Sequence, residues 1–298
     1  MSRLVCVVGS LNDDITLQVP VLPAPGETVL TAGRRRQSPG GKGANQAAAA
    51  AALGAHVAMV GAVGADEPGE RSVAALAAVG VDVSGVRRRE HLATGGAVVV
   101  VDAEGENTIV VDPGANGTVA PAEVRDSVTS LAPAVVLAQL EVPLDAVATA
   151  VRASPGTTVV LNPAPMPADP GPVRDLLPSV GVLVPNRGEL GRLAGRPEPR
   201  TPDAVVDCVR TLDLPGAVVV TLGADGALCL EGGGEPVVVP GERVATVDAS
   251  GAGDVFCGCL AAQLATGVPL VDAVRRANTA AANSTTYRGA RVPVDFRA

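Results

Sequence analysis

The sequence predicts an α/β fold in three layers, with helices on both faces of a mostly parallel central sheet and a small β-sheet lid. Two observations predict this fold. From about residue 121 onward, short apolar runs typical of buried strands alternate with longer helix-forming segments, as in parallel sheets. Before that point, two runs at 96–101 and 107–111 are joined by five residues that include a glycine, which indicates a hairpin.

The strands of the main sheet are expected where apolar residues gather and a turn residue ends the run. Residues 4–9 are the first such run and end in glycine, as a buried parallel strand often does. The last two runs, at 227–230 and 236–240, are expected to be antiparallel. The runs between them lie at 56–60, 134–138, 158–161, 181–184 and 217–222.

Helices are expected where strong helix formers follow a turn and a glycine or a loop ends the segment. The alanine-rich segment 43–53 ends at Gly54, and the segment 67–79 ends at Gly80. Residues 15–36 alternate only weakly and carry several prolines, so they predict an irregular hairpin outside the main sheet. The later helices are expected at 144–153, 203–212, 251–266 and 270–286.

Composition predicts one folded unit. The chain has 298 residues, of which 47% are hydrophobic and 18% charged, so it is too apolar and too weakly charged for a disordered protein. This length suits a single large α/β domain. We therefore expect residues 1–298 to form one domain, with the lid supplied by about 15–36 and 96–111.

Charge and residue usage also exclude several functions. The net charge is −8 and only three residues are aromatic, which argues against a nucleic-acid partner. The five cysteines form no CxxC pair, so neither a zinc site nor a disulfide framework is indicated, and reduced thiols in the cytoplasm are expected. The arginine runs 34–36 and 87–89 are expected at solvated loop or edge positions.

No membrane partner is expected. The apolar run 4–8 is too short for the core of a signal peptide. The uncharged stretch 47–65 is mostly alanine and is interrupted by glycines, so a buried helix followed by a strand explains it better than a membrane span.

The most informative segment is residues 247–256, where we expect a strand to end, a turn of small residues to follow and a helix to begin. Free amides at a helix N-terminus attract anions, so Gly251, Ala252 and Gly253 could hold a phosphate. Asp254 would then lie beside that phosphate, where it could accept a proton from an attacking hydroxyl. The alternative is that Asp254 only favours the helix dipole.

Other polar residues follow the predicted strands at their carboxyl ends, where parallel α/β sheets bind ligands. Asn12 and Asp14 follow the first strand, Glu141 a later one, and Asn186 and Glu189 another. Each could instead belong to an ordinary turn. Taken together they predict one cleft for a polyhydroxylated ligand and a phosphate donor.

A second glycine-rich turn, 39–46, opens a helix with Lys42 and Asn45, which suit hydrogen bonding to a polyol. It is not a Walker A loop, because the upstream glycine spacing and the following Ser or Thr are absent. No GxGxxG motif follows the first strand, so a dinucleotide fold is not supported.

Over nearly its whole length the chain resembles the ribokinase-like (PfkB) carbohydrate kinases. Two stretches match the family signatures, GGKGANQA at 40–47 and DASGAGD at 248–254. The forms GGKGANQ, QLE and NPAP point to the ribose-phosphorylating members. Supporting pieces lie in the expected order at 9–14, 25–29, 105–107, 139–141, 162–165, 185–189 and 221–226.

The resemblance implies transfer of the ATP γ-phosphoryl group to the 5-hydroxyl of D-ribose, giving D-ribose 5-phosphate. It implies that Asp254 is the general base and that residues 251–253 form the anion hole. The implied sugar ligands are Asn12, Asp14, Gly40, Gly41, Lys42, Asn45, Glu141 and Asp254. The implied nucleotide site consists of Asn186, Thr221, Leu222, Gly223, Ala224, Asp225, Gly226, Gly253 and Asn278.

Two metal sites are implied in the same way. Glu189 would organise Mg²⁺ through water. A monovalent cation, usually K⁺ in the family, would be held by Asp248, Ser250, Ser284, Tyr287 and Gly289. The chain departs from the family at Pro293, near where a cation-site serine is often found.

Other readings stay open. The chain could be a kinase of the same family for another sugar or a nucleoside, although its few aromatic residues disfavour a nucleoside. Phosphorylated sugars would need extra cations, which the arginines at 34–36 could supply. A catalytically silent sugar-binding relative is a further alternative. Because the exposed edges of the lid strands invite pairing, we also expect a homodimer through the lids.

Overall fold

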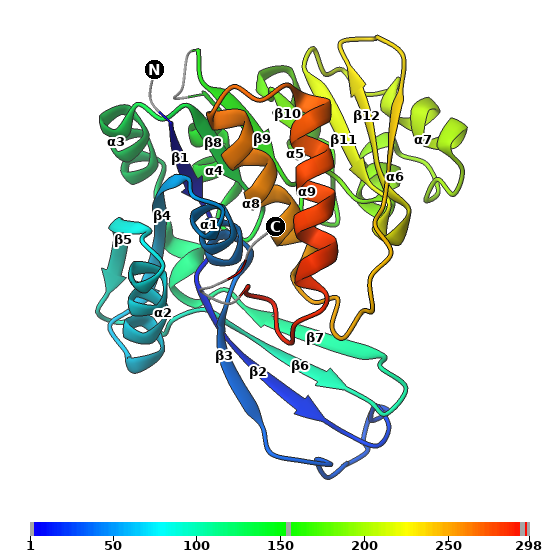
Figure 1. The fold of residues 1–298 in the computed structure, drawn as a ribbon. Coiled ribbons are helices and arrows are strands. Elements are labelled where there is room, and N and C mark those ends of the chain that lie inside the picture. The colour runs from blue at the N-terminus through cyan, green and yellow to red at the C-terminus, as the bar shows by residue number, and fades with distance from the viewer. Residues whose placement is uncertain (1–2, 153–155, 293–295, 297–298) are drawn as a thin grey trace.

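The computed structural model describes residues 3–152, 156–292 and 296. A nine-stranded central sheet has the strand order β13-β12-β11-β10-β9-β8-β1-β4-β5 (Figure 1). The strands from β5 to β11 pair in parallel, and β12 and β13 pair antiparallel. Their bounds are β1 Leu4–Val8, β4 His56–Gly64, β5 Asp82–Arg89, β8 Val135–Ala138, β9 Thr158–Leu161, β10 Val182–Leu183, β11 Ala217–Thr221, β12 Gly226–Glu231 and β13 Val237–Pro240.

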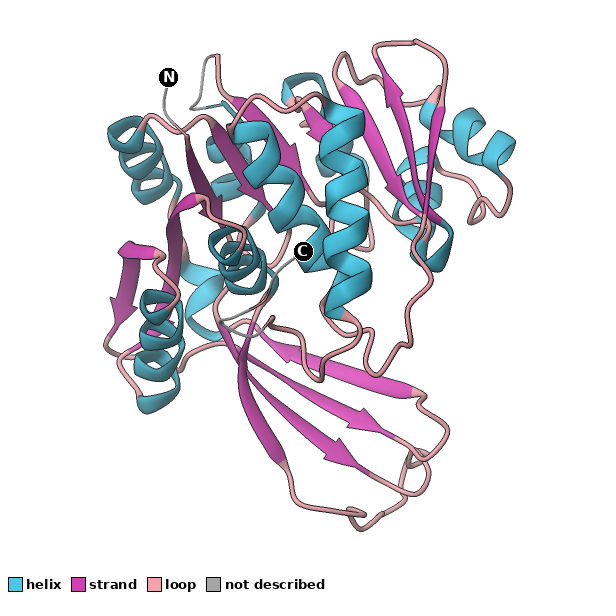
Figure 2. Cartoon of the chain, in the orientation of Figure 1, coloured by secondary structure: helices cyan, strands magenta, loops and turns pink. Residues whose placement is uncertain are grey.

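Helices cover both faces of this sheet (Figure 2). Alternate residues of β1 belong to different cores, because Val5 and Val7 pack on one face and Cys6 and Val8 on the other. One core is closed by α1 Lys42–Ala52, α2 Glu67–Ala78, α8 Ala252–Ala265 and α9 Leu270–Ser284. The other is closed by α3 Pro121–Leu131, α4 Leu144–Arg152, α5 Gly171–Arg174, α6 Arg187–Ala194 and α7 Pro202–Val209. This arrangement confirms the predicted three-layer fold.

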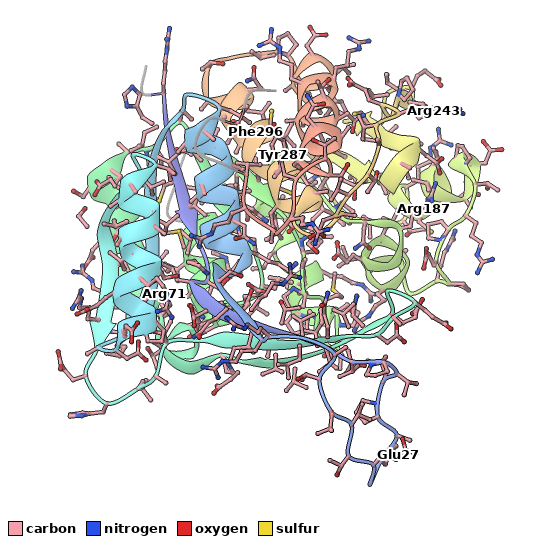
Figure 3. The ribbon with its side chains drawn as sticks, turned by 60° about the horizontal axis from the view of Figure 1, so that its bottom comes forward. Glu27, Arg71, Arg187, Arg243, Tyr287 and Phe296 are labelled. Carbon is pink, nitrogen blue, oxygen red and sulfur yellow. The ribbon has the colours of Figure 1, made fainter. Side chains whose placement is uncertain are left out.

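A separate four-stranded sheet extends from the central body, with the order β3-β2-β6-β7. Its strands are β2 Asn12–Gln18, β3 Arg36–Gly40, β6 Gly96–Val101 and β7 Asn107–Asp112. Glu27 lies at the far tip of the loop that joins β2 to β3 (Figure 3). The sequence predicted an irregular hairpin over 15–36. The structure instead places its two strands, β2 and β3, at 12–18 and 36–40, with the loop between them.

Two elements differ from the sequence prediction. Strand β5 was not predicted, because its sequence DVSGVRRR carries few apolar residues; it is an edge strand, and it contains the arginine run 87–89. The strand expected to end at Val247 is absent, and residues 241–250 form a loop instead. The amides of Val247 and Asp248 donate to the carbonyl of Thr285, so backbone contacts with the end of α9 hold this loop. Within the described ranges, no helix combines the length and apolar character that crossing a bilayer requires.

Helices α1 and α8 pack closely because both present small residues. A Cβ atom added at Gly258 of α8 would lie 2.5 Å from the carbonyl oxygen of Gln46 and 2.9 Å from the Cβ of Ala49. The same contact sets the distance between the N-terminal turns of the two helices, where the candidate site residues lie.

We predict that Gly258→Ala lowers the free energy of unfolding by about 1–3 kcal/mol, because the added methyl group overpacks this contact. Urea unfolding followed by circular dichroism measures the change. The matched control is Gly117→Ala, where the nearest atom to the added Cβ would be 3.7 Å away. Equal stability of the Gly258→Ala variant and the unaltered chain would contradict this account of the packing.

Candidate active site

The carboxyl ends of the central strands meet in a small cavity of about 160 Å³. Lys42, Asn186, Glu189 and Asp254, which the sequence singled out, lie together in its wall. The complete lining is Lys42, Asn162, Ala164, Val184, Asn186, Glu189, Thr221, Gly251, Gly253, Asp254 and Cys257.

Asp254 is held on both carboxylate oxygens by amide side chains of α1. Asn45 Nδ2 donates to Oδ2 at 3.0 Å, and Gln46 Nε2 donates to Oδ1 at 3.0 Å. Asp254 itself is 8% exposed and lines the cavity, so the carboxylate is both fixed and within reach of a ligand. Such a carboxylate can accept a proton from a bound hydroxyl.

Gln46 is the centre of a buried amide network. Its Nε2 also donates to Asn162 Oδ1 at 3.1 Å, and its Oε1 accepts from Gln139 Nε2 at 2.6 Å. Asn162 in turn donates to the carbonyl of Val184 at 2.9 Å. The network ties α1 to the ends of β8, β9 and β10, so the orientation of Asp254 depends on the central sheet.

The N-terminus of α8 offers free amides beside Asp254. The amides of Gly253 and Asp254 have no hydrogen-bond acceptor among the described residues. Gly251, the N-cap, has φ of +74°, and a Cβ there would lie 2.3 Å from the carbonyl oxygen of Ala290, so the position requires glycine. These amides can bind an anion at the wall of the cavity.

The predicted sugar ligands gather at the root of the small sheet. Asp14 accepts from the amide of Ala97 at 3.0 Å and lies against Gly40. Asn12 accepts from Asn116 Nδ2 at 2.8 Å.

Glu141, another predicted sugar ligand, lies against the start of α1 and the residues that follow β1. It accepts from the amide of Lys42 at 2.8 Å and from the hydroxyl of Ser10, and a Cβ at Gly41 would reach the backbone of Ser10 and Asn12. The first strand, the start of α1 and the end of β8 are thereby joined.

Burial and neighbouring charges shift the ionisation of these groups. Burial raises the pKa of Asp14 to about 6, the amide of Ala97 opposes the shift, and Glu141 and Asp13 add to it. Burial also disfavours the charged form of Lys42, but the carboxylates of Asp254 and Glu141 outweigh it and raise the Lys42 pKa overall. Lys42 is therefore a cation in a cavity walled by carboxylates.

Only some of the residues predicted to bind the nucleotide line the cavity. Asn186 and Thr221 line the cavity and form a bridge between the ends of β10 and β11. Gly223, Ala224 and Asp225 form an exposed turn beyond it.

Three further predicted nucleotide residues lie away from the cavity wall. Leu222 is buried, and Gly226 begins β12. The side-chain Nδ2 of Asn278 donates to the backbone carbonyls of Val239 and Pro240, so this side chain holds α9 against β13.

The implied magnesium residue, Glu189, keeps one carboxylate oxygen that accepts no hydrogen bond within the described part of the chain. Glu189 accepts from the amide of Asn186 through Oε2 at 2.9 Å, which completes a capping box and leaves Oε1 available. Burial raises the pKa of Glu189, and hydrogen bonding and Lys42 oppose the shift. One carboxylate suits Mg²⁺, which usually keeps several waters and binds substrate phosphates.

Three of the residues implied for the monovalent cation, Asp248, Ser250 and Gly289, lie together. Asp248 accepts from the amides of Ser250 and Gly289, each at 2.9 Å. Burial favours a higher pKa for Asp248, but these hydrogen bonds lower it overall. Ser284 donates its hydroxyl to Ala281, and Tyr287 is exposed and packs edge-on against Phe296. Pro293 lies outside the described residues.

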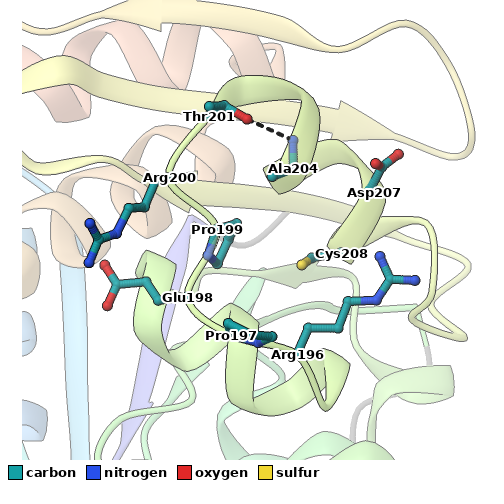
Figure 4. Close-up of a pocket in the computed structure, with 9 residues that line it drawn as sticks. All are labelled: Arg196, Pro197, Glu198, Pro199, Arg200, Thr201, Ala204, Asp207 and Cys208. Atoms are coloured by element: carbon teal, nitrogen blue, oxygen red, sulfur yellow. Dashed lines mark hydrogen bonds between the residues drawn. The ribbon is translucent and has the colours of Figure 1, made fainter.

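A larger hollow of about 390 Å³ lies away from this site, between the loop after α6 and helix α7 (Figure 4). Its walls include Arg196, Arg200, Glu198 and Cys208. It holds none of the residues that the sequence predicted for binding or catalysis, so the chemistry belongs to the smaller cavity.

The family model described as pfkB family carbohydrate kinase matches residues 2–297. The chain belongs to this family. It is 34% identical to a ribokinase of Schizosaccharomyces pombe, over 96% of this chain and 93% of the relative. It is also 34% identical to a deoxyribokinase of Salmonella typhimurium, with the same coverage. The structure of Arabidopsis thaliana ribokinase complexed with ribose and ATP superimposes with a TM-score of 0.84 at 31% identity, over 97% of this chain and 95% of that one.

Membership of the PfkB carbohydrate kinases confirms the resemblance drawn from the two glycine-rich signatures. Four residues that the structure places in the site had no role predicted from the sequence: Gln46, Gln139, Asn162 and Arg291. The first three stood inside quoted motifs, so their motif membership was an available signal. Arg291 follows the last helix with no motif of its own, and only the folded chain brings it to the site.

Proposed function

We propose that the chain transfers the γ-phosphoryl group of ATP to the 5-hydroxyl of D-ribose, giving D-ribose 5-phosphate. The observation that carries the proposal is the placement of Asp254, which is fixed by two amides, lines the cavity and adjoins free backbone amides of α8. The ribokinase relatives support ribose as the acceptor. The Arabidopsis ribokinase is complexed with ATP as well as ribose, which supports ATP as the donor.

In this proposal Asp254 accepts the proton of the sugar hydroxyl while the oxygen attacks phosphorus in line with the leaving ADP. The amides of Gly253 and Asp254 stabilise the charge that develops on the transferred phosphoryl group, and each such donor contributes about 3–4 kcal/mol. Lys42 lines the same cavity and adds a positive charge there. Asn186 and Thr221 hold the nucleotide side.

Metal ions complete the proposed site. Mg²⁺, held through water by Glu189, would neutralise phosphate charge. A monovalent cation, K⁺ in our proposal, would be held by oxygens of Asp248, Ser250, Ser284, Tyr287 and Gly289. The residues present fit both ions, because all the donors are oxygens. Asp248 joins the loop before α8 to the segment after α9, so a cation there would support the anion hole from outside the reaction.

The charge of the proposed sugar subsite favours a neutral sugar. Three carboxylates, Asp14, Glu141 and Asp254, face two cations, Lys42 and Arg291. A phosphorylated sugar would add further negative charge, and the arginines at 34–36, which were the candidates to offset it, are exposed in and before β3. The deoxyribokinase relative makes 2-deoxyribose the second candidate substrate.

We also infer a homodimer through the small sheet, which in this proposal is the lid over the sugar. Its face opposite Asp14 carries apolar side chains in register across three strands: Ile15, Val98 and Val110. Val98 is 39% and Val110 66% exposed. A second copy presenting the same face would bury both.

We infer that the protein works in the cytoplasm. All five cysteines are free and buried, which supports a reducing compartment.

The function is tested by ADP release, coupled to a dehydrogenase assay, over a panel of pentoses, 2-deoxyribose, hexoses and nucleosides. We expect the highest kcat/KM with D-ribose. A higher value with 2-deoxyribose would transfer the proposal to that sugar. ADP release with none of these acceptors would favour the silent sugar-binding relative and overturn the proposal.

We predict that Asp254→Asn lowers kcat by at least about 10²-fold, because the amide cannot accept the proton. Equilibrium titration with ATP should show that nucleotide affinity changes little. Asp272→Asn on the exposed face of α9 serves as the control and should keep full turnover. Turnover retained in the Asp254→Asn variant would remove this residue from its role.

We predict that kcat/KM for ribose falls about tenfold per pH unit below about pH 6. The pKa of Asp14 is raised to about 6, so protonation below that pH removes a hydrogen-bond acceptor for the sugar. Initial rates at saturating ATP give the profile. The Asp14→Asn variant should show lower kcat/KM without this acid limb. A flat profile down to pH 5 in the unaltered chain would contradict the assignment.

We predict that Val110→Lys converts the dimer to a monomer, because a charge would be buried in the apolar contact. Light scattering after size-exclusion chromatography measures the mass. Val238→Lys is the control, since Val238 is 53% exposed on β13 of the central sheet. If the unaltered chain is monomeric, the dimer proposal fails.

A further inference from the structure

Arg291 reaches into the proposed sugar subsite from the segment that follows α9. Its Nε donates to Asn45 Oδ1 at 3.1 Å, and its Nη2 donates to the carbonyl of Gly40 at 3.2 Å. Both partners belong to the glycine-rich signature that opens α1. The side chain thus joins the end of the chain to the residues proposed to hold the sugar.

The guanidinium is a partly buried cation. No carboxylate forms an ion pair with it among the described residues. Burial lowers the pKa of Arg291 to about 10, and the carboxylates of Asp14 and Asp254 oppose the shift. The group is therefore charged at neutral pH and acts electrostatically on the two carboxylates proposed for sugar binding and proton transfer.

Arg291 and Asp254 together decide how the Asn45 amide points. A carboxylate only accepts and a guanidinium only donates, so Nδ2 must face Asp254 and Oδ1 must face Arg291. The reversed amide would place two acceptors together at Asp254 and two donors together at Arg291. Without Arg291, the bond to Asp254 would be the one side-chain hydrogen bond among the described residues that opposes that reversal or a change of rotamer.

We propose that Arg291 is a positioning residue of the sugar subsite, which fixes Asn45 with its side-chain amide nitrogen on Asp254 and joins Asn45 to the backbone of Gly40. The inference rests on the proposed sugar kinase function and names a residue that the two family signatures do not contain. Removal of Arg291 should weaken sugar binding without weakening ATP binding, since neither of its contacts belongs to the nucleotide side.

The test compares Arg291→Met, which loses both the charge and the donors, with Arg291→Lys, which keeps the charge but loses the planar fork. The matched control is Arg275→Met, because Arg275 forms an exposed ion pair with Asp272 on α9. KM for ribose, KM for ATP, kcat and the pH profile of kcat/KM for ribose are measured for each. Circular dichroism and thermal unfolding establish that the variants are folded.

For Arg291→Met we expect KM for ribose to rise about tenfold or more, with KM for ATP within about twofold of the unaltered value. The acid limb should move to higher pH, because the lost cation no longer opposes Glu141 and Asp13 in setting the Asp14 pKa. For Arg291→Lys we expect a raised KM for ribose with the acid limb unmoved. A merely structural role would not separate these two readouts.

Three results would overturn the proposal. They are an unchanged KM for ribose in the folded Met variant, an equal rise in both KM values, and an acid limb that stays in place in the Met variant. Should the Met variant fail to fold, the Lys variant decides, and an unchanged KM for ribose there overturns the proposal. Failure of the proposed function is distinct, because it appears in the unaltered chain as absence of sugar-dependent ADP release.

Discussion

The close contact between α1 and α8 is the constraint on which the site depends. The two helices meet at Gly258, where the backbone of Gln46 leaves no room for a side chain. That approach brings the amides of Asn45 and Gln46 to 3.0 Å from the two oxygens of Asp254. Residues more than 200 positions apart in sequence thus form one unit. A looser contact would leave the carboxylate free to choose other rotamers, and catalytic groups lose rate quickly when their geometry is lost.

The segment after α9 reinforces this unit at three successive residues. Gly289 binds Asp248 through its amide, Ala290 packs against the backbone of Gly251, and Arg291 binds Asn45. The segment therefore touches the proposed cation loop, the anion hole and the sugar side in turn. Three consecutive residues of one backbone segment thus join the three places directly.

The sequence was sufficient for the main sheet because buried parallel strands are continuous apolar runs. Strand β9 coincides with the predicted 158–161, and β8 and β11 differ only by one residue at an end. Strand β5 escaped prediction because three arginines occupy its exposed edge. The loop before α8 was expected to be a strand ending at Val247, whereas the backbone partner of Val247 and Asp248 is Thr285, directly after α9, and this contact depends on the tertiary structure.

For the site, the sequence could place residues at the ends of strands but could not pair them. Lys42, Asn186, Glu189 and Asp254 were expected in one cleft and line one cavity. The partners of Asp254 could not be foreseen, since hydrogen bonds between α1 and α8 depend on how the helices pack. The role of Arg291 could not be predicted either, because nothing in the sequence around it indicates that it would donate to Asn45 and Gly40.

Strand β2 alternates its side chains between the two faces of the small sheet. Asn12 and Asp14 lie on the face of the proposed sugar contacts, and Asp13 between them lies on the other face and pairs with Arg71 of α2 at 3.0 Å. A rotation of the small sheet relative to the central body would therefore move both proposed sugar contacts and this ion pair together. Carbohydrate binding would then be thermodynamically coupled to the tilt of the sheet. If binding requires a tilt that distorts the Arg71–Asp13 pair, the free energy of that distortion weakens the observed affinity, and if the tilt improves the pair, the affinity is strengthened.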